Sequence, residues 1–151
     1  MKEAIGNAFL TGLAIVFLSL IMLLLISSLT YSKAYKAKNK IVSTIEKYDG
    51  FTAEAAEEIN QNLHSIGYRT SHSNQKCAEL SNADELHGNT VTVVHDTDEG
   101  DYHYCLYEVR TSRGAYFHAI TFMQFDIPII GEYLNFKVEG DSRVVYEGLV
   151  G

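Results

Sequence analysis

The chain has 151 residues, a single proline and a formal net charge of −7. The charge is unevenly distributed: residues 1–48 carry six lysines and two glutamates, whereas residues 49–151 carry 17 acidic and 6 basic side chains. An acidic domain of this kind argues against nucleic acid as a partner, because phosphate binding needs clustered lysine and arginine.

An uncharged apolar run dominates the N-terminal part of the chain. Residues 9–29, FLTGLAIVFLSLIMLLLISSL, contain neither a charged residue nor proline. A helix needs about 20 mostly apolar residues to cross about 30 Å of hydrocarbon, so this run predicts a transmembrane helix. The lipid bilayer is therefore an expected partner, contacted by anchor residues that include Phe9, Ile15, Phe17, Leu23 and Leu29.

Two other interpretations account for less of this run. A cleaved secretory signal has an apolar region of about 7–15 residues and then a small-residue cleavage site. Here the run is longer and leads into Ser27, Ser28, Thr30 and Tyr31. A helix buried in a soluble protein would need a large core to cover so many uncharged residues. We therefore expect a retained anchor.

The helix is expected to continue well beyond the membrane. Neither proline nor glycine occurs between Leu13 and Asp49, and apolar residues recur at helical spacing after residue 30. A helix of roughly 40 residues would be about 60 Å long, twice the hydrocarbon thickness. Its apolar face, expected to pack against the chain's own domain or against neighbouring copies, comprises Tyr31, Tyr35, Ile41, Val42, Ile45 and Tyr48.

These features divide the chain into three parts. Residues 1–30 form the N-terminal tail and transmembrane helix, residues 31–50 the amphipathic helical extension, and residues 51–151 an acidic domain. The extension carries most of the basic charge of the chain's first 48 residues, so it is expected either to lie at the level of the lipid headgroups or to expose a solvated lysine face.

Two features of the sequence disagree about the side of the membrane on which the domain lies. Four lysines between residues 33 and 40 follow the apolar run, and positive charge beside a membrane helix tends to stay in the cytoplasm. Cys77 and Cys105 favour the other side, since paired cysteines staple small domains outside the cytoplasm. A bridge between them would close a loop of about 29 residues and add on the order of 3 kcal/mol.

A second helix is predicted before the sheet. Thr52 is a suitable N-cap, acidic residues follow it, and Gly67 is a natural helix stop, which together predict a helix over about 53–66. Its apolar face comprises Ala56, Ile59, Leu63 and Ile66. The polar segment 68–89, which contains Cys77, is predicted to be a loop that a disulfide would pin.

From residue 90 onward the hydrophobic period becomes two, which is typical of half-buried strands. Strands are predicted at 90–95, 102–110, 115–126, 133–138 and 143–147, with the last hairpin turning around Gly140 and Asp141. The apolar segment 120–131 is predicted to be a central strand under the helices, or else a patch that meets the membrane or a partner. The expected fold class is thus α+β, with a long N-terminal helix, a second short helix and an antiparallel meander of about five strands.

Two sets of side chains are candidates for metal binding. Among the six histidines, His95 and His103 are a candidate pair because they could lie across one hairpin. No known zinc spacing accompanies them, and surface histidines on a polar domain are the simpler explanation. The carboxylates of Asp96, Asp98 and Asp101 resemble half of a calcium loop, but its twelfth position holds no glutamate. An acidic turn is the simpler interpretation, and we expect no metal and no cofactor.

Catalytic motifs find no support in these residues. There is no G-x-S-x-G, no glycine-rich turn that opens a helix, and no motif context around either cysteine. The ten tyrosines are concentrated in the predicted strands, where they suit sheet packing or an assembly face. We therefore expect a protein without enzymatic activity.

The whole arrangement resembles pilin-like proteins. Three segments carry the resemblance: Gly6-Asn7 before the anchor, YSKAYKAKNKI at residues 31–41 after it, and FDIPIIG at residues 125–131. The chain is most similar to TadE-like minor pilins and uncharacterised single-pass relatives from low-GC Gram-positive bacteria. The resemblance implies an extracytoplasmic domain, lateral packing of the N-terminal helices, and processing at Gly6-Asn7. The fifth residue after such a cleavage would be Thr11, where pilins carry an acidic residue, and an uncleaved helix is equally compatible.

The expected function is therefore assembly: a pilin-like or minor-pilin-like cell-surface protein that associates laterally with itself or with other pilin-like subunits. One alternative is a membrane-tethered binding module for a partner protein or extracellular Ca²⁺. The other is a membrane adaptor that faces the cytoplasm, as the lysine asymmetry suggests.

Overall fold

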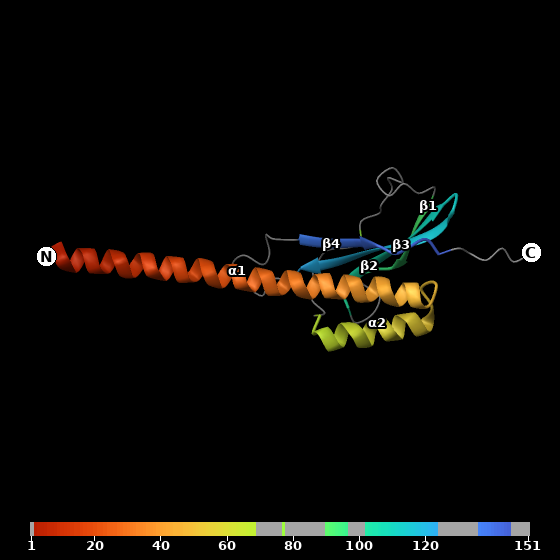
Figure 1. Ribbon diagram of the computed structural model, residues 1–151, viewed down its shortest axis with the longest axis horizontal. Helices are drawn as coiled ribbons and strands as arrows, with labels where there is room; N and C mark the ends of the chain where they lie inside the picture. The colour runs from red at the N-terminus through yellow and green to blue at the C-terminus, as the bar shows by residue number, and fades with distance from the viewer. Residues whose placement is uncertain (1, 69–76, 78–89, 97–101, 124–135, 146–151) are drawn as a thin grey trace, which may run out of the picture.

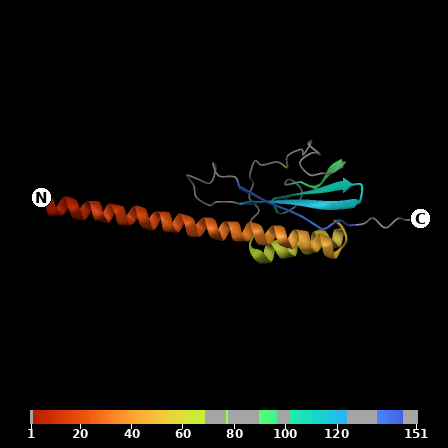
Figure 2. The same ribbon diagram turned by 45° about the horizontal axis from the view of Figure 1, so that its top comes forward.

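The computed structural model describes residues 2–68, 77, 90–96, 102–123 and 136–145. In chain order the elements are α1 (Lys2–Lys47), α2 (Ala53–Ile66), β1 (Thr90–His95), β2 (Tyr104–Thr111), β3 (Gly114–Met123) and β4 (Phe136–Asp141). The fold is α+β, as predicted. The N-terminal part of α1 projects far beyond the domain, while its C-terminal part lies along the sheet beside α2 (Figure 1 and Figure 2).

The long helix is continuous, in agreement with the absence of proline. It spans 46 residues, which corresponds to about 70 Å. It ends at Lys47, and Asp49 and Gly50 then adopt positive φ angles of 51° and 151° in a tight turn. The Gly50 N–H donates to the Ile45 carbonyl at 3.0 Å, which satisfies one of the last carbonyls of the helix.

The second helix has the predicted bounds and caps. The Thr52 hydroxyl accepts a hydrogen bond from the Ala55 N–H, and Gly67 closes the helix in the left-handed conformation at φ 66°. Its fully buried residues are Ala55, Ile59 and Leu63. The predicted face is right at Ile59 and Leu63, whereas Ala56 and Ile66 are only half-buried. The turn after α1 folds α2 back against it, because both helices carry one apolar face.

The sheet is an antiparallel meander with the strand order β1-β2-β3-β4. Its longest pairing joins β2 and β3 from Tyr104↔Thr121 to Thr111↔Gly114, across the turn that precedes Gly114. The described residues contain four strands rather than the five predicted. The expected hairpin at Gly140 and Asp141 is wrong, because both residues lie inside β4 and pair with Ala119 and His118.

The C-terminal end of the described chain continues along β3 instead of turning back. Ser142 N–H donates to the Phe117 carbonyl at 2.9 Å, and Val145 forms an isolated bridge with Ala115. A Gly-Asp pair permits a turn but does not require one. The backbone hydrogen bonds still open on β3 are satisfied by continuing straight, which explains why the hairpin does not form.

The two faces of the sheet carry separate apolar clusters. The first lies between the sheet and the two helices and includes Ala37, Ile41, Ile45, Ile59, Leu63, Tyr68, Tyr104, Leu106, Phe117 and Ala119. The second lies on the opposite face and comprises Cys105, Tyr107, Ile120 and Phe122, with Cys77 and Val91 partly buried against it. The C-terminal part of α1 is therefore a core element of the domain.

Candidate functional site

The most unusual surface of the molecule is the N-terminal part of α1. Residues 6–22 are all exposed, and this part of the helix is long and apolar enough to cross a membrane. Of the predicted anchor residues, Leu23 is half-buried, and the others are exposed: Phe9, Ile15, Phe17 and Leu29. This segment is therefore not part of the core of the chain's own domain.

Four hydroxyl side chains in or just after the apolar run bond to the helix's own backbone. Thr11, Ser19 and Ser27 each donate to the carbonyl four residues earlier at 2.8 Å, and Thr30 does so at 2.9 Å. In hydrocarbon an unsatisfied hydroxyl would be costly, because no water can replace its partner. The sequence analysis did not predict these hydroxyl-to-carbonyl hydrogen bonds, although the serines and threonines themselves are apparent in the sequence.

The predicted assembly face is divided by the structure. Ile41 and Ile45 are completely buried in the helix-facing cluster, and Val42 packs partly against it. Tyr48 is half-buried and donates its hydroxyl to Glu58 at 2.9 Å. These residues pack against the chain's own domain, which is one of the two partners expected for this face. They therefore cannot also form a contact face for neighbouring copies.

Two tyrosines from the predicted face stay exposed. Tyr31 and Tyr35 stack with ring centroids 6.1 Å apart, and Lys38 Nζ lies 4.6 Å from the centroid of the Tyr35 ring. Residues spaced at i, i+4 and i+7 follow one side of a helix, so these three form a single strip. It begins two residues after Leu29, the last residue of the apolar run.

A second strip on α1 is basic. Lys33, Lys36 and Lys40 are exposed, and their i, i+3, i+7 spacing places them along one side of the helix. None of these three has a carboxylate within 4.0 Å among the residues that the structure describes. Lys47 behaves differently, because its Nζ lies 2.6 Å from Glu58 and ties the end of α1 to α2.

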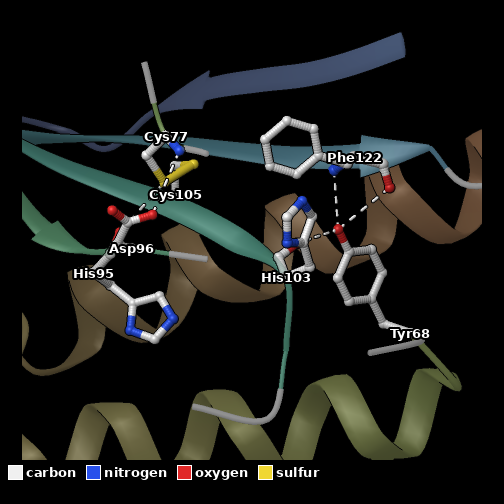
Figure 3. Close-up of a disulfide and its surroundings, with 7 residues drawn as sticks. All are labelled: Tyr68, Cys77, His95, Asp96, His103, Cys105 and Phe122. Carbon is white, nitrogen blue, oxygen red and sulfur yellow. Dashed lines mark hydrogen bonds between the residues drawn. A yellow bond between two sulfur atoms is a disulfide. The ribbon is translucent and has the colours of Figure 1, made fainter. Parts of the chain in front are cut away.

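Cys77 and Cys105 are joined by a disulfide with a Cα–Cα distance of 5.7 Å (Figure 3). It attaches residue 77 to the centre of the sheet on the face turned away from the helices. Asp96 supports the same attachment, since its Oδ1 accepts a hydrogen bond from the Cys77 N–H at 3.4 Å. The bridge therefore crosses from β2 to a segment that follows α2 in the sequence.

The structure keeps the candidate ligands His95 and His103 apart, for a reason that lies in β1. The register shifts between Val93, which pairs with Tyr107, and His95, which pairs with Leu106. This bulge turns His95 toward the helices, where its ring stacks on Tyr104 at 4.1 Å. The His103 ring instead packs on Phe122 of the opposite cluster at 4.6 Å, so the two imidazoles cannot share a metal ion.

Of the three aspartates considered for calcium binding, Asp96 lies among the described residues. Asp96 is engaged with the Cys77 backbone, whereas Asp98 and Asp101 lie outside the described residues. The same holds for residues 124–131 of the predicted apolar segment, while residues 120–123 complete β3. Within the described ranges, no three histidine, cysteine, aspartate or glutamate side chains gather as a metal site.

Tyr68 makes a polar contact that sequence reasoning missed. Its hydroxyl donates to the His103 carbonyl at 2.8 Å and accepts from the Phe122 N–H at 2.9 Å (Figure 3). Burial raises the pKa of this hydroxyl to about 12, and the hydrogen bond to the Phe122 backbone partly opposes that rise. Tyr68 thus fastens the chain after α2 to the ends of two strands.

A buried imidazole on β3 was also missed. His118 is almost fully buried, with Nδ1 2.6 Å from Asp141 Oδ1 and Nε2 4.0 Å from Glu139 Oε2. Asp141 faces His118 because the two are register partners in β4 and β3. The pairing of His118 with Asp141 was missed because Asp141 was predicted to lie in a turn. A prediction of one continuous strand through Asp141 would have placed the two residues opposite each other. A single imidazole held by a carboxylate suits sheet stability more than chemistry.

Gly6 and Asn7, the implied processing site, lie within the exposed beginning of α1.

Comparisons of the chain with models of known protein families, with curated proteins and with solved structures found no match.

Proposed function

We propose that the chain is a non-enzymatic, single-pass membrane protein that acts by assembly in a pilin-like manner. Its apolar helix packs laterally on like helices, while the disulfide-stapled sheet domain lies outside the cytoplasm. One observation carries the proposal: a single unbroken helix is exposed and mostly apolar over residues 6–22, yet forms part of the core of the domain from Ala34 onward.

This division supports a rigid connection between the membrane and the domain. A flexible linker would let a domain move freely on its anchor, whereas a continuous helix fixes the domain's orientation relative to the span. Copies that associate through their spans then present their domains in register. Lateral association inside lipid depends on close packing at small residues, and Gly12 offers such a position, since a Cβ there would meet nothing within 4 Å.

The disulfide supports the extracytoplasmic side. Structural disulfides form and persist in oxidising compartments and are rare in the cytoplasm. Cys105 is buried in the sheet, and the Cys77 backbone N–H is held by Asp96, so the bridge has a clear structural task. The lysines on α1 argue for the other side, and this keeps a cytoplasm-facing adaptor as the second candidate.

Cysteine cross-linking in native membranes tests the assembly. Because both natural cysteines are bonded to each other, an added cysteine is the single free thiol. Five variants, with cysteine placed in turn at positions 17–21, sample all sides of the span at 100° per residue. We expect disulfide-linked dimers whose yield varies around the helix, with one side preferred. Thr92→Cys on exposed β1 is the control.

Absence of dimers at all five positions, with the protein present in the membrane, contradicts assembly through the span. Orientation is tested separately with a membrane-impermeant maleimide on intact cells. We expect the native cysteines to be labelled only after addition of a reductant. Labelling that needs cell lysis and no reductant would support the cytoplasmic adaptor instead.

A further inference from the structure

We propose that the end of the sheet domain nearest the membrane is itself a lipid-contacting surface that takes anionic phospholipid headgroups. Its apolar part is the pair Met123 and Phe136, and its polar part is the collar of Tyr31, Lys33, Lys36 and Lys40 on α1. We call these six residues the juxtamembrane surface. The inference rests on the membrane anchoring in the proposed function, but it is independent of lateral assembly.

The first step is the alignment of β4 with α1. Thr121, which pairs with Val138, donates its hydroxyl to the Ala34 carbonyl at 3.0 Å. Further along, the stem of Lys38 covers Gly140 so closely that a Cβ there would collide with it. At the far end, the Arg143 N–H donates to Glu46 at 2.7 Å.

These contacts advance together along both elements. From Val138 to Arg143 the chain covers about 16 Å at 3.3 Å per residue, and from Ala34 to Glu46 the helix covers about 18 Å at 1.5 Å per residue. β4 therefore runs alongside α1 in the same direction, as both views show (Figure 1 and Figure 2). About two strand residues correspond to four helix residues.

The same alignment sets the level of Phe136. Phe136 lies two residues before Val138, about 6.6 Å closer to the N-terminal end of α1. Ala34 lies five residues after Leu29, about 7.5 Å beyond the apolar run. Phe136 and its register partner Met123 are therefore level with the end of the membrane span. Among the residues that the structure describes, none forms a spacer between the domain and the span.

This position explains an apolar side chain that the protein exposes. Phe136 is 49% exposed and begins β4 at the edge of the sheet. At the boundary between hydrocarbon and headgroups, a phenyl ring can bury this surface in lipid, as the apolar faces of interfacial helices do. Tyr31 supports the same depth, because tyrosine is enriched where membrane and water meet.

The basic strip supplies charge complementarity at this level. Lys33, Lys36 and Lys40 begin about 6 Å past Leu29 and extend to about 16 Å, which spans the headgroup layer and the first water layers. The domain is otherwise acidic, with 17 acidic and 6 basic residues over 49–151. An anionic membrane therefore repels most of the domain and attracts this collar, which favours one orientation.

Tryptophan fluorescence of the full-length chain in vesicles tests the proposal, because the natural chain contains no tryptophan. Phe136→Trp is reconstituted in phosphatidylcholine vesicles, with and without phosphatidylglycerol, that contain acyl-chain-brominated lipid as a quencher. We expect the emission of this variant to be blue-shifted and mostly quenched in the anionic vesicles. Val144→Trp, an exposed apolar site at the far end of the domain, is the matched control and should keep its emission.

Tyr31→Trp separates failure of this inference from failure of the anchor. Quenching of the indole at position 31 without quenching at position 136 would overturn the juxtamembrane surface and leave the anchor intact. Absence of quenching at both positions would overturn the anchor, and with it both proposals.

The headgroup specificity has its own variant. Replacing Lys33, Lys36 and Lys40 together by glutamine in the Phe136→Trp background should abolish the gain in quenching that phosphatidylglycerol produces. Arg113→Gln, at the exposed turn between β2 and β3, should not. Quenching at position 136 that is the same in neutral and anionic vesicles would overturn anionic headgroup binding.

Discussion

The two halves of α1 belong to one unbroken helix but have opposite surroundings. Leu18, in the first half, is 61% exposed, whereas Ile45, in the second, is fully buried. Both lie in one continuous helix with the same backbone hydrogen bonding. The difference lies in what surrounds each half: the sheet and α2 cover the second, and in the described residues little of the domain reaches the first.

The pattern around the helix explains the division. The first half is apolar on every side, which a soluble domain cannot satisfy with one packed face but a bilayer can. The second half has one apolar face with lysines on the others, which is the pattern of a helix on a sheet. The two halves of the helix therefore suit different surroundings: the first suits hydrocarbon, and the second suits a packed interface with water on its other side. The composition of the helix changes where these surroundings change.

The largest expected effect comes from shortening one side chain in each half. Ile45→Ala should lower the free energy of unfolding of the domain by about 4 kcal/mol, because it removes a fully buried side chain and leaves a cavity. Leu18→Ala, a matched truncation in the exposed half, should leave it unchanged. Chemical denaturation in detergent micelles, followed by the near-ultraviolet circular dichroism of the tyrosines, measures both.

Equal effects of the two truncations would contradict the division of α1. The domain would then depend on the membrane half for its stability, and the boundary near Ala34 would have no thermodynamic meaning.

The disulfide sharpens the comparison from the face that α1 does not cover. Cys105→Ser should cost the domain about 3 kcal/mol, since the bridge joins residues 28 positions apart and closes a loop in the unfolded chain. Membrane retention should be unchanged, because Cys105 lies in the cluster on the opposite face of the sheet from α1. Retention is measured by alkaline carbonate extraction, and stability by the same denaturation. An unaltered midpoint would show that the bridge has no role in stability.

Tyr68 tests whether the buried half of the molecule depends on single polar contacts. Tyr68→Phe leaves the His103 carbonyl and the Phe122 N–H without their partner, which should cost about 2 kcal/mol. Tyr31→Phe, on the exposed strip, is the matched control and should have no effect on stability.

The raised pKa of Tyr68 gives this prediction a second readout. Its pKa is about 12 in the folded protein, and burial also raises the pKa of Tyr107 to about 12, against about 10 for an unfolded chain. The folded state therefore holds these protons more tightly, so the stability they contribute is complete below about pH 10 and is lost as the pH rises to about 12. Tyr68→Phe should reduce this alkaline loss. Identical dependence of stability on pH in the wild type and in Tyr68→Phe would refute the attribution of this alkaline loss to Tyr68.

Much of the helical architecture was predictable because local signals agree with each other. The charge-free run, the absence of proline, and the Thr52 and Gly67 caps each predict the element that forms. The bounds of α2 follow from two residues whose side chain and conformation act within one helical turn. Such signals need no knowledge of the tertiary structure.

The sheet was predicted less well because register is not local. The bulge at Val94 moves His95 to the other face of the sheet. No sequence signal in that segment predicts the bulge, since neither glycine nor proline is present. The Gly140-Asp141 pair has turn chemistry, yet pairing with β3 carries the strand through it. The division of the predicted assembly face is likewise a tertiary result: helical spacing identifies an apolar face but not its partner.

The smallest expected effect lies where the buried half of α1 ends. Lys47 and Tyr48 both bond Glu58 Oε2, at 2.6 and 2.9 Å, and join α1 to α2 at the surface. The hydrogen bond from Lys47, followed by that from Tyr48, holds the pKa of the Glu58 carboxyl below its usual range, while the bond to Glu58 raises the pKa of Lys47. Glu58→Gln should therefore lower the melting temperature slightly, and by less than any preceding destabilising variant, because exposed pairs contribute little.

The dependence on pH distinguishes this pair from the buried contacts. Because the pKa of Glu58 is lowered on folding, its contribution is present above the unfolded value of about 4.3 and is lost as the pH falls through the folded value. The raised pKa of Lys47 ends the contribution at high pH, where the tyrosines also titrate, so the acid side is diagnostic. The difference in melting temperature between wild type and Glu58→Gln should shrink on acidification. A difference that stays constant down to acid pH would mean that packing, and not charge, joins the end of α1 to α2.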